Sequence, residues 1–441
     1  MGQAGKRLQT SLRGIANKAR EDRRHRFGNL YGLLDEEALL DSWRLLNKSA
    51  AGGVDGVTAA IYAENLHENI HGLVERLKRK HYRAKLVRRR HIPKDETSTR
   101  PLGLPALEDK LLQLAVSRIL EAIFEPSFRT CSYAYRKGRG AHQAVRDLTQ
   151  ELQFGCYGYV VDVDIKGFFD NIDHDKLLEI MAMRIDDRPF LRLIKKWLKA
   201  GVLEEDGSVI HPGTGCPQGG TISPILANLY LHVVLDHWFE VTMRPHFRYR
   251  SHVCRYADDV VFAFQRRTEA EHFYKALRCR LGRYGLELSE KKSRIVRFSR
   301  FQLGRQSDSF EFLGFEFRWM KDRNGVPRVK RRTSRKRFRK TLAALKEWCR
   351  SGRSTSFRAL LASFDRRLVG HYNYYGVMGN SHSLWSLYLE ARRLLYKWLN
   401  RRSQKRSYSW RKFTALLRRY RVTQPRIMEC RRRQLVLSFA G

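Results

Sequence analysis

Two adjacent carboxylates, Asp258 and Asp259, lie in the segment Arg255–Phe264, between two apolar runs rich in β-branched and aromatic residues. Such runs predict strands, so the pair falls at a tight turn. Neighbouring side chains on an extended chain point to opposite faces, so only one of the two aspartates can point fully at a given site. Carboxylates this close repel one another unless a cation lies between them. The pair therefore indicates either a divalent-cation site or a turn that uses aspartate for its turn propensity.

A second acidic element lies upstream, in the apolar segment Tyr159–Asp170, from which Asp162 and Asp164 emerge. The two residues have the same parity on a strand, so both can face one side of a sheet. Chemistry that uses two divalent ions needs a carboxylate from a separate strand, because one hairpin cannot enclose two ions. Asp164 is therefore the candidate partner of the Asp258–Asp259 pair.

A glycine- and proline-rich loop, Gly215–Pro224, stands between the two acidic elements and opens an apolar helix expected at Ile225–Leu231. Glycines let the backbone approach a ligand closely. Downstream, the segments Gly285–Ser293 and Phe310–Phe315 complete a series of motifs that share one order along the chain.

In this order the motifs resemble those of a group II intron-type reverse transcriptase, also called an intron maturase, over residues ~50–320. Seven motifs carry the resemblance: GVDG at 53–56, IPK at 92–94 with RPLG at 100–103, VDVDIKGFFDNIDHD at 161–175, GCPQGGTISP at 215–224, RYADD at 255–259, LSEKKS at 288–293 and FEFLGF at 310–315. Residues ~325–420 are similar to the thumb, or maturase domain, of the family. The resemblance implies an α+β fold: a right-hand polymerase with fingers and palm, built from an antiparallel sheet plus helices, and an α-helical thumb.

The resemblance also implies a division of the chain into five parts. These are an N-terminal helical extension at 1–50, fingers at 51–157, a palm at 158–320, a thumb or maturase domain at 321–420 and a short basic tail at 421–441. Turn signals at 323–327 predict a connector into the thumb. Helices are expected at Leu177–Met183, Leu191–Lys199, 333–349, 355–369 and 384–400.

The same resemblance assigns catalytic roles to Asp164, Asp258 and Asp259. Its metal site comprises Asp164, Ile165, Asp258 and Asp259 and holds two Mg²⁺ ions, with Mn²⁺ as an alternative. Asp162 is an extra carboxylate that not all members carry.

The dNTP site implied by the resemblance comprises Lys94, Arg100, Phe169, Gln218, Gly219 and Lys292. Lys94 and Arg100 match fingertip cations that clamp the triphosphate, although ordinary surface charge would also explain them. Phe169 matches an aromatic residue that stacks under the sugar and excludes a 2′-OH; the alternative is that Phe169 packs in the core. Gln218 and Gly219 would line the nascent base pair, and Lys292 would be a general acid near the leaving pyrophosphate.

Composition favours a polyanionic partner, since the formal net charge is +41. Residues 321–441 hold 33 Lys and Arg against 5 Asp and Glu, a net of +28. Within this region Arg335, Lys336, Arg337 and Arg339 are the candidate RNA phosphate contacts. An acidic membrane surface is the competing partner, but no apolar run approaches the ~18–20 residues that span a bilayer. The expected partners are template and intron RNA, a DNA primer or target and dNTPs, with a homodimer left open.

The N-terminus lacks the apolar core of a signal peptide, and the seven cysteines show no Cys-x-x-Cys pair. Both features favour a cytoplasmic protein with reduced thiols and no zinc site. Many family members end in an endonuclease domain of His/Asn residues and paired cysteines. Residues 421–441 offer only Glu429 and Cys430, so we expect no cleavage of a second DNA strand.

Three functions are compatible with these patterns. The first is an intron-encoded protein that reverse transcribes its intron RNA and assists splicing. The second is a free-standing or domesticated enzyme of the same lineage, acting in repair or phage defence. The third is a non-catalytic RNA-binding splicing cofactor, which the intact Asp164, Asp258 and Asp259 argue against.

Overall fold

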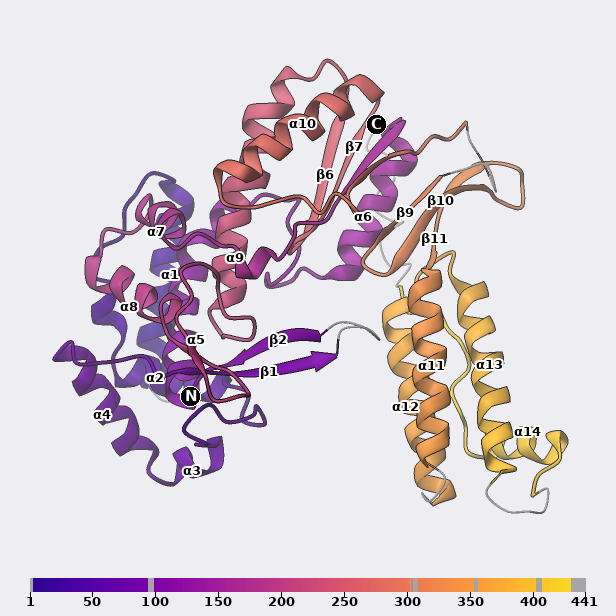
Figure 1. Ribbon diagram of the computed structural model, residues 1–441, viewed down its shortest axis with the longest axis horizontal. Coiled ribbons are helices and arrows are strands. Elements are labelled where there is room, and N and C mark those ends of the chain that lie inside the picture. Colours follow the sequence, from indigo (N-terminus) through magenta and orange to yellow (C-terminus); the bar gives the residue numbers. More distant parts are fainter. Residues whose placement is uncertain are drawn as a thin grey trace.

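The computed structural model describes residues 3–93, 99–301, 303, 308–352, 356–401 and 407–429. The first part of the chain is helical, with α1 (Gln3–Glu21), η1 (Tyr31–Leu33), α2 (Glu36–Leu45), α3 (Ala59–Glu64) and α4 (Leu66–Lys78). It continues as β1 (Val87–Pro93), β2 (Thr99–Leu104), α5 (Leu107–Phe124), η2 (Glu125–Ser127) and α6 (Ala141–Phe154). The antiparallel β1–β2 hairpin extends toward the C-terminal helices in Figure 1. A short pair, β4 (Val202–Leu203) and β5 (Val209–Ile210), completes its sheet.

A four-stranded antiparallel sheet lies at the centre of the molecule. Its order is β6 (Ser251–Tyr256), β7 (Asp259–Phe264), β3 (Tyr159–Val163) and β8 (Arg294–Arg297). Phe262 and Phe264 belong to one buried cluster, while Val261 and Ala263 belong to another. Because both faces are covered, the inner strands β3 and β7 are apolar at most positions instead of alternating.

The central region also contains helices. They are η3 (Phe168–Asp170), α7 (His174–Ala182), α8 (Arg188–Leu198), α9 (Ser223–Leu231), the π-helical η4 (His232–Met243), η5 (Arg244–His246) and α10 (Arg267–Arg283). Of these helices, α10 packs on β3 and β7. The predicted helices at 177–183, 191–199 and 225–231 correspond to α7, α8 and α9 within a few residues.

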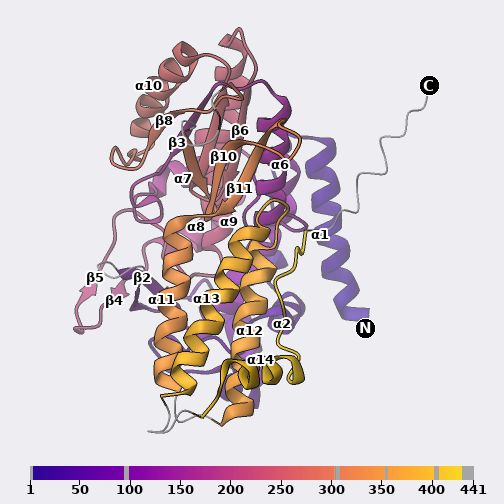
Figure 2. The same ribbon diagram turned by 90° about the vertical axis from the view of Figure 1, so that its right-hand side faces the viewer.

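The C-terminal region begins with a second antiparallel sheet and ends in a helical bundle. The sheet has the order β11 (Pro327–Thr333), β10 (Phe315–Lys321) and β9 (Ser309–Phe312). The bundle contains α11 (Arg335–Ser351), α12 (Phe357–Tyr375), α13 (Ser381–Leu399) and α14 (Trp410–Arg419), which lie below β10 and β11 in Figure 2. Residues 323–327, predicted as an interdomain connector, instead form the turn of the β10–β11 hairpin and the first residue of β11.

Three sizeable hydrophobic clusters show how the parts are joined. One runs from α1 and α2 through α5 to the helices around the central sheet, so the N-terminal helices share a core with the rest of that region. A second joins α6, the other face of the sheet and β9–β11. The helical bundle has a third, separate core. The α+β class predicted from sequence is confirmed, with fingers, palm and a helical thumb.

Candidate active site

The two adjacent aspartates lie at the β6–β7 hairpin, where Tyr256 pairs with Asp259 across a two-residue turn of Ala257 and Asp258. The predicted tight turn is therefore present. Ala257 has φ of 56°, a left-handed conformation that costs a residue with a Cβ atom roughly 1–2 kcal/mol. Nearby structure must hold this turn in place.

Arg255 supplies that support from inside the protein, since its side chain is fully buried. Its guanidinium donates to both carboxylate oxygens of Asp236, at 2.7 and 2.6 Å, and to the Ala257 carbonyl at 3.2 Å. It also donates to Asn228 Oδ1 at 3.1 Å and Ser132 Oγ at 2.7 Å. Burial alone would raise the pKa of Asp236, but the adjacent guanidinium holds it below its usual value. The carboxylate–guanidinium pair thus clamps the turn that carries Asp258.

Sequence reasoning missed this clamp. The available signal was an arginine directly after the apolar pair Val253 and Cys254 in a predicted strand, because a buried strand rarely contains an arginine unless it is paired. Its partners are 19 to 123 residues away in the chain, on three other segments. Local patterns could not have identified them.

The structure brings four carboxylates into mutual electrostatic range at this edge of the sheet. Loss of hydration on burial, and then the charges of Asp258 and Asp164, raise the pKa of Asp259 to about 6. Burial raises the pKa of Asp162 to about 7, with Asp259 and Asp164 adding to the effect and Arg294 opposing it. The charges of Asp162 and Asp164 are therefore coupled, and the common face that their parity predicts stays a prediction.

Asp164 directly follows β3 and is held by its neighbours. Its backbone N–H donates to Ser293 Oγ at 3.1 Å, and its carbonyl accepts from Ser289 N–H at 2.8 Å. Its carboxylate forms an ion pair with Lys292, at 3.1 Å from Oδ2 to Nζ. Ile165, predicted to share the metal site, is buried and bridges to Leu288. The LSEKKS motif thus packs directly against the catalytic strand.

One cation of the fingers lies within electrostatic range of these carboxylates. The charge of Arg100 on β2 partly opposes the rise in the pKa of Asp259. Tyr135, which sequence reasoning did not select, lies beside this group: burial and then Asp258 raise its pKa, while Arg100 opposes them. Lys94, the second predicted fingertip cation, lies outside the described residues.

The GCPQGG loop docks onto β2. The Gly103 N–H donates to the Gln218 carbonyl at 2.6 Å. Gly219 has φ of +109°, and a Cβ atom there would lie 2.6 Å from the Gly103 carbonyl oxygen. Only glycine fits this close approach. The loop predicted to line the substrate thus connects fingers to palm.

Phe168 and Phe169 have different environments. Phe168 is 2% exposed and belongs to the main core, whereas Phe169 is half-buried at the core's margin. The Phe169 carbonyl accepts from the Cys216 N–H at 2.7 Å, so its backbone is tied to the GCPQGG loop. Its ring is partly accessible, and its role as a sugar-facing aromatic stays a prediction.

The four predicted RNA contacts divide into different surroundings. Arg337 partly opposes the raised pKa values of Asp259, Tyr374 and Tyr375, so it lies within electrostatic range of Asp259. Arg335 and Arg339 line a recess on the thumb, and Lys336 is exposed.

The donor set is suited to a hard divalent cation. Among the described residues, no three side chains of His, Cys, Asp or Glu form a ready metal-ligand set. However, all the side-chain donors at this edge are carboxylates, the ligands that Mg²⁺ prefers. Burial, and then repulsion from Asp258 and Asp164, raises the pKa of Asp259, and the Lys292 ammonium group pairs with Asp164. These residues fit a bound Mg²⁺ chemically.

Comparison with known proteins agrees with this architecture, which is that of a right-hand polymerase. The family model for reverse transcriptase (RNA-dependent DNA polymerase) matches residues 92–317, just over half of the chain. The chain belongs to the reverse transcriptase family.

Several relatives are intron-encoded. The chain is 38% identical to the group II intron-encoded protein LtrA of Lactococcus lactis over 226 residues, which cover 50% of this chain but only 37% of LtrA. It is 38% identical over 183 residues to a 91 kDa protein in the cob intron of Schizosaccharomyces pombe, covering 42% of this chain and 22% of that protein. Protein YkfC of Escherichia coli is 31% identical over 353 residues, covering 72% of this chain and 90% of YkfC. The resemblance to group II intron reverse transcriptases is confirmed.

Other observations bear on the remaining expectations. No helix within the described ranges is long and apolar enough to cross a membrane. The six cysteines that the structure describes are free thiols. Glu429, one of the two residues considered for a nuclease, pairs instead with Arg331 at 2.5 Å and accepts from the Met378 N–H at 2.7 Å. Cys430 lies outside the described residues.

Proposed function

We propose that this protein is an RNA-directed DNA polymerase of the group II intron type, which reverse transcribes intron RNA and assists its splicing by binding it. The observation that carries the proposal is the electrostatic coupling of Asp164, which follows β3, with Asp258 and Asp259 of the β6–β7 hairpin, with Arg100 of the fingers in range of Asp259. The family membership and the names of the intron-encoded relatives support it.

Asp164, Asp258 and Asp259, with Ile165 beside them, would hold two Mg²⁺ ions in this proposal. When bound, the ions activate the primer 3′-oxygen and neutralise charge on the triphosphate. The rest of the task is positioning and charge neutralisation by the protein. Arg255 and Asp236 hold the turn so that Asp258 stays in place, and Ser293 fixes the backbone of Asp164.

The substrate-binding groups come from three elements in this scheme. Arg100, with Lys94, binds the triphosphate from the fingers, and Gln218 and Gly219 line the base pair from the loop. Phe169 excludes the 2′-OH of a ribonucleotide. Lys292, whose ammonium pairs with Asp164, would donate a proton to the leaving pyrophosphate; this ion pair with a proposed metal ligand supports the role.

The division into N-terminal extension (1–50), fingers (51–157), palm (158–320), thumb (321–420) and basic tail (421–441) is retained as part of the proposal. The separate core of the α11–α14 bundle supports an independent thumb.

The test is primer extension by the purified full chain on an RNA template, with Mg²⁺ and the four dNTPs. We expect full-length cDNA, and no product when rNTPs replace dNTPs. A splicing cofactor without polymerase activity would bind the RNA and extend nothing. Self-splicing of the intron that encodes the protein, at low and high Mg²⁺, measures the splicing role separately.

A further inference from the structure

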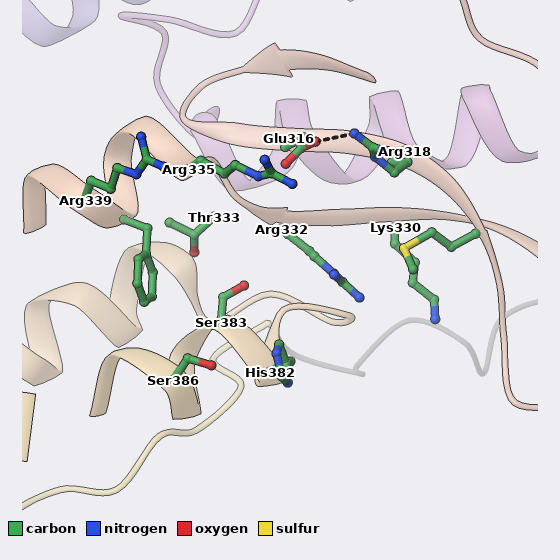
Figure 3. Close-up of a pocket in the computed structure, with 12 residues that line it drawn as sticks. Glu316, Arg318, Lys330, Arg332, Thr333, Arg335, Arg339, His382, Ser383 and Ser386 are labelled. Atoms are coloured by element: carbon green, nitrogen blue, oxygen red, sulfur yellow. Dashed lines mark hydrogen bonds and ion pairs between the residues drawn. The ribbon is translucent and has the colours of Figure 1, made fainter. Parts of the chain in front are cut away.

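A basic recess lies between the β10–β11 hairpin and the thumb helices, away from the carboxylates. Its volume is about 690 Å³, within the range of sites that hold a compact ligand. Figure 3 shows Arg332 and Lys330 from β11, Arg335 and Arg339 from α11, and His382 from α13 around it.

The register of the hairpin builds one wall of this recess. Glu316 pairs with Arg332 and Arg318 with Lys330, so all four side chains lie on the same face of the sheet. The opposite face carries Phe315, Phe317 and Trp319, which are buried against the second core. One face of the sheet is therefore apolar and packed. The other is polar and covered only in part by the thumb.

The recess has more cationic side chains than carboxylates to neutralise them. Its lining includes five cationic side chains, Arg318, Lys330, Arg332, Arg335 and Arg339, but a single carboxylate. That carboxylate, Glu316, pairs with Arg318 at 2.9 Å. Arg332 Nε is buried and has no hydrogen-bond partner among the described residues. A buried donor without a partner costs free energy, so it indicates a ligand that accepts hydrogen bonds.

The far wall adds further donors. Helix α13 begins at Ser381, and Ser383 and Ser386 of its first two turns line the recess together with His382. The free N–H groups and positive dipole end of a long helix favour an anion at this position. The serine hydroxyls can donate to the same ligand.

Two apolar side chains distinguish this recess from a simple phosphate site. Met320 from β10 and Phe338 from α11 contribute to its lining. An aromatic ring next to cations suits a nucleobase, which stacks on the ring while the phosphates on either side meet the arginines. The combination matches one nucleotide with its neighbouring phosphates.

We propose that this recess binds a single unpaired nucleotide extruded from folded RNA, an inference that rests on the proposed function of binding intron RNA. Bases stacked within a regular RNA duplex are not free to enter such a pocket. Proteins recognise RNA sequence and shape mainly at loops and bulges, where bases can splay out. The recess would thereby let the thumb discriminate folded intron RNA from duplex RNA.

The test compares two RNA hairpins that differ only in one unpaired adenosine in the stem. Binding is measured by fluorescence anisotropy at several salt concentrations. We expect the wild-type protein to bind the bulged hairpin about tenfold more tightly, the order that stacking of one base contributes. The Lys330→Gln/Arg332→Gln variant should bind both hairpins alike, with a shallower salt dependence for the bulged one.

A charge-matched control and a steric variant separate the recess from general effects. Arg358→Gln/Arg366→Gln removes two exposed cations from α12, and should keep the preference for the bulge. Ser383→Trp fills the recess without changing charge, and should abolish the preference even if the β11 variant does not fold. Equal binding of both hairpins by the wild type, or an undiminished preference in folded Ser383→Trp, would overturn the proposal. Primer extension by the same wild-type preparation tests the proposed function independently, so the two failures can be told apart.

Discussion

The carboxylate edge of the palm and the basic recess of the thumb are both clusters of like charge, yet the protein tolerates them by different means. In the palm, carboxylates can take up protons, and the pKa of Asp259 is raised to about 6. Guanidinium groups in the recess cannot release theirs. They stay charged, and Arg335 and Arg339 keep contact with water.

The two regions also differ in how rigidly they are built. The palm turn is fixed by a buried ion pair and by the central sheet. The recess is formed between a sheet and separate helices that have their own core. Chemistry needs fixed positions, whereas binding of a large RNA tolerates a more open site. This contrast leads to five predictions, beginning with the largest effect.

Asp258→Asn should separate the two regions most sharply. It removes a proposed metal ligand, so primer extension should fall by at least roughly 10³-fold, while affinity for RNA stays close to that of the wild type. Extension rates and RNA dissociation constants measured on the same preparation check both parts. Near-normal extension would show that the reaction does not depend on this turn.

Asp236→Ala should test the support of the palm. It leaves Arg255 buried without its partner, which costs about 3–5 kcal/mol of unfolding free energy. Urea unfolding measures this loss. The matched control is Asp186→Ala, which breaks the exposed ion pair with Arg26 at 3.1 Å and should cost at most ~1 kcal/mol. Similar losses in the two variants would mean that the buried pair does not hold the turn.

Phe169→Val should relax sugar selection in the palm. Discrimination between dNTPs and rNTPs should fall by at least roughly tenfold, since the space reserved against the 2′-OH opens. The paired control, Phe168→Val, removes a ring from the core; it should lose stability without a change in selectivity. Competition assays with mixed nucleotides, alongside urea unfolding, measure both. An unchanged ratio in folded Phe169→Val rejects the gate.

Asp162→Asn should measure the free energy that the charged Asp162 carboxylate costs the folded protein. The pKa of Asp162 is about 7 in the folded protein, above its ordinary value of 3.8. Between these two pH values the native state therefore binds more protons than the unfolded state. Stability therefore falls as pH rises from about 4 to about 7. Without Mg²⁺, the variant should be more stable than the wild type at about pH 8, by on the order of 1–3 kcal/mol, and equal to it near pH 4. A difference that does not vary with pH contradicts this assignment.

Arg337→Gln should give the smallest effect, and it tests whether Arg337 acts on the palm carboxylates or with the recess. Since this cation lowers the pKa of Asp259, its loss should shift the acidic limb of extension upward by a fraction of a pH unit. Arg335→Gln/Arg339→Gln should leave that limb in place. It should instead reduce the salt slope of RNA binding by ~0.7–0.9 for each lost phosphate contact. If both variants change only the salt slope, Arg337 belongs functionally with the recess.

Sequence reasoning recovered the elements that carry their own local signal. The apolar runs around Asp258 and Asp259 predicted the hairpin, because strand propensity and turn position are encoded within a few residues. The parity of Asp162 and Asp164 predicts a common face in the same way, and their charges are coupled in the structure. Three of the four thumb helices, α11, α12 and α13, were predicted close to their observed positions, although α12 ends six residues later than predicted, and α14 was not predicted. The 323–327 segment was misread because a turn signal does not reveal whether a helix or a strand follows it.

By itself the sequence determined the family of the chain and the candidate residues for its chemistry, since motifs and charge are local properties of the chain. Only the tertiary structure decided how they combine. Arg255 forms a buried ion pair with Asp236, and Lys292 forms an ion pair with Asp164. Arg337 lies within electrostatic range of Asp259, and Arg332 lines the recess. These outcomes depend on strand register and on contacts between distant segments. Burial in the folded protein then raises the pKa values of Asp162 and Asp259 above the ordinary value of an aspartate.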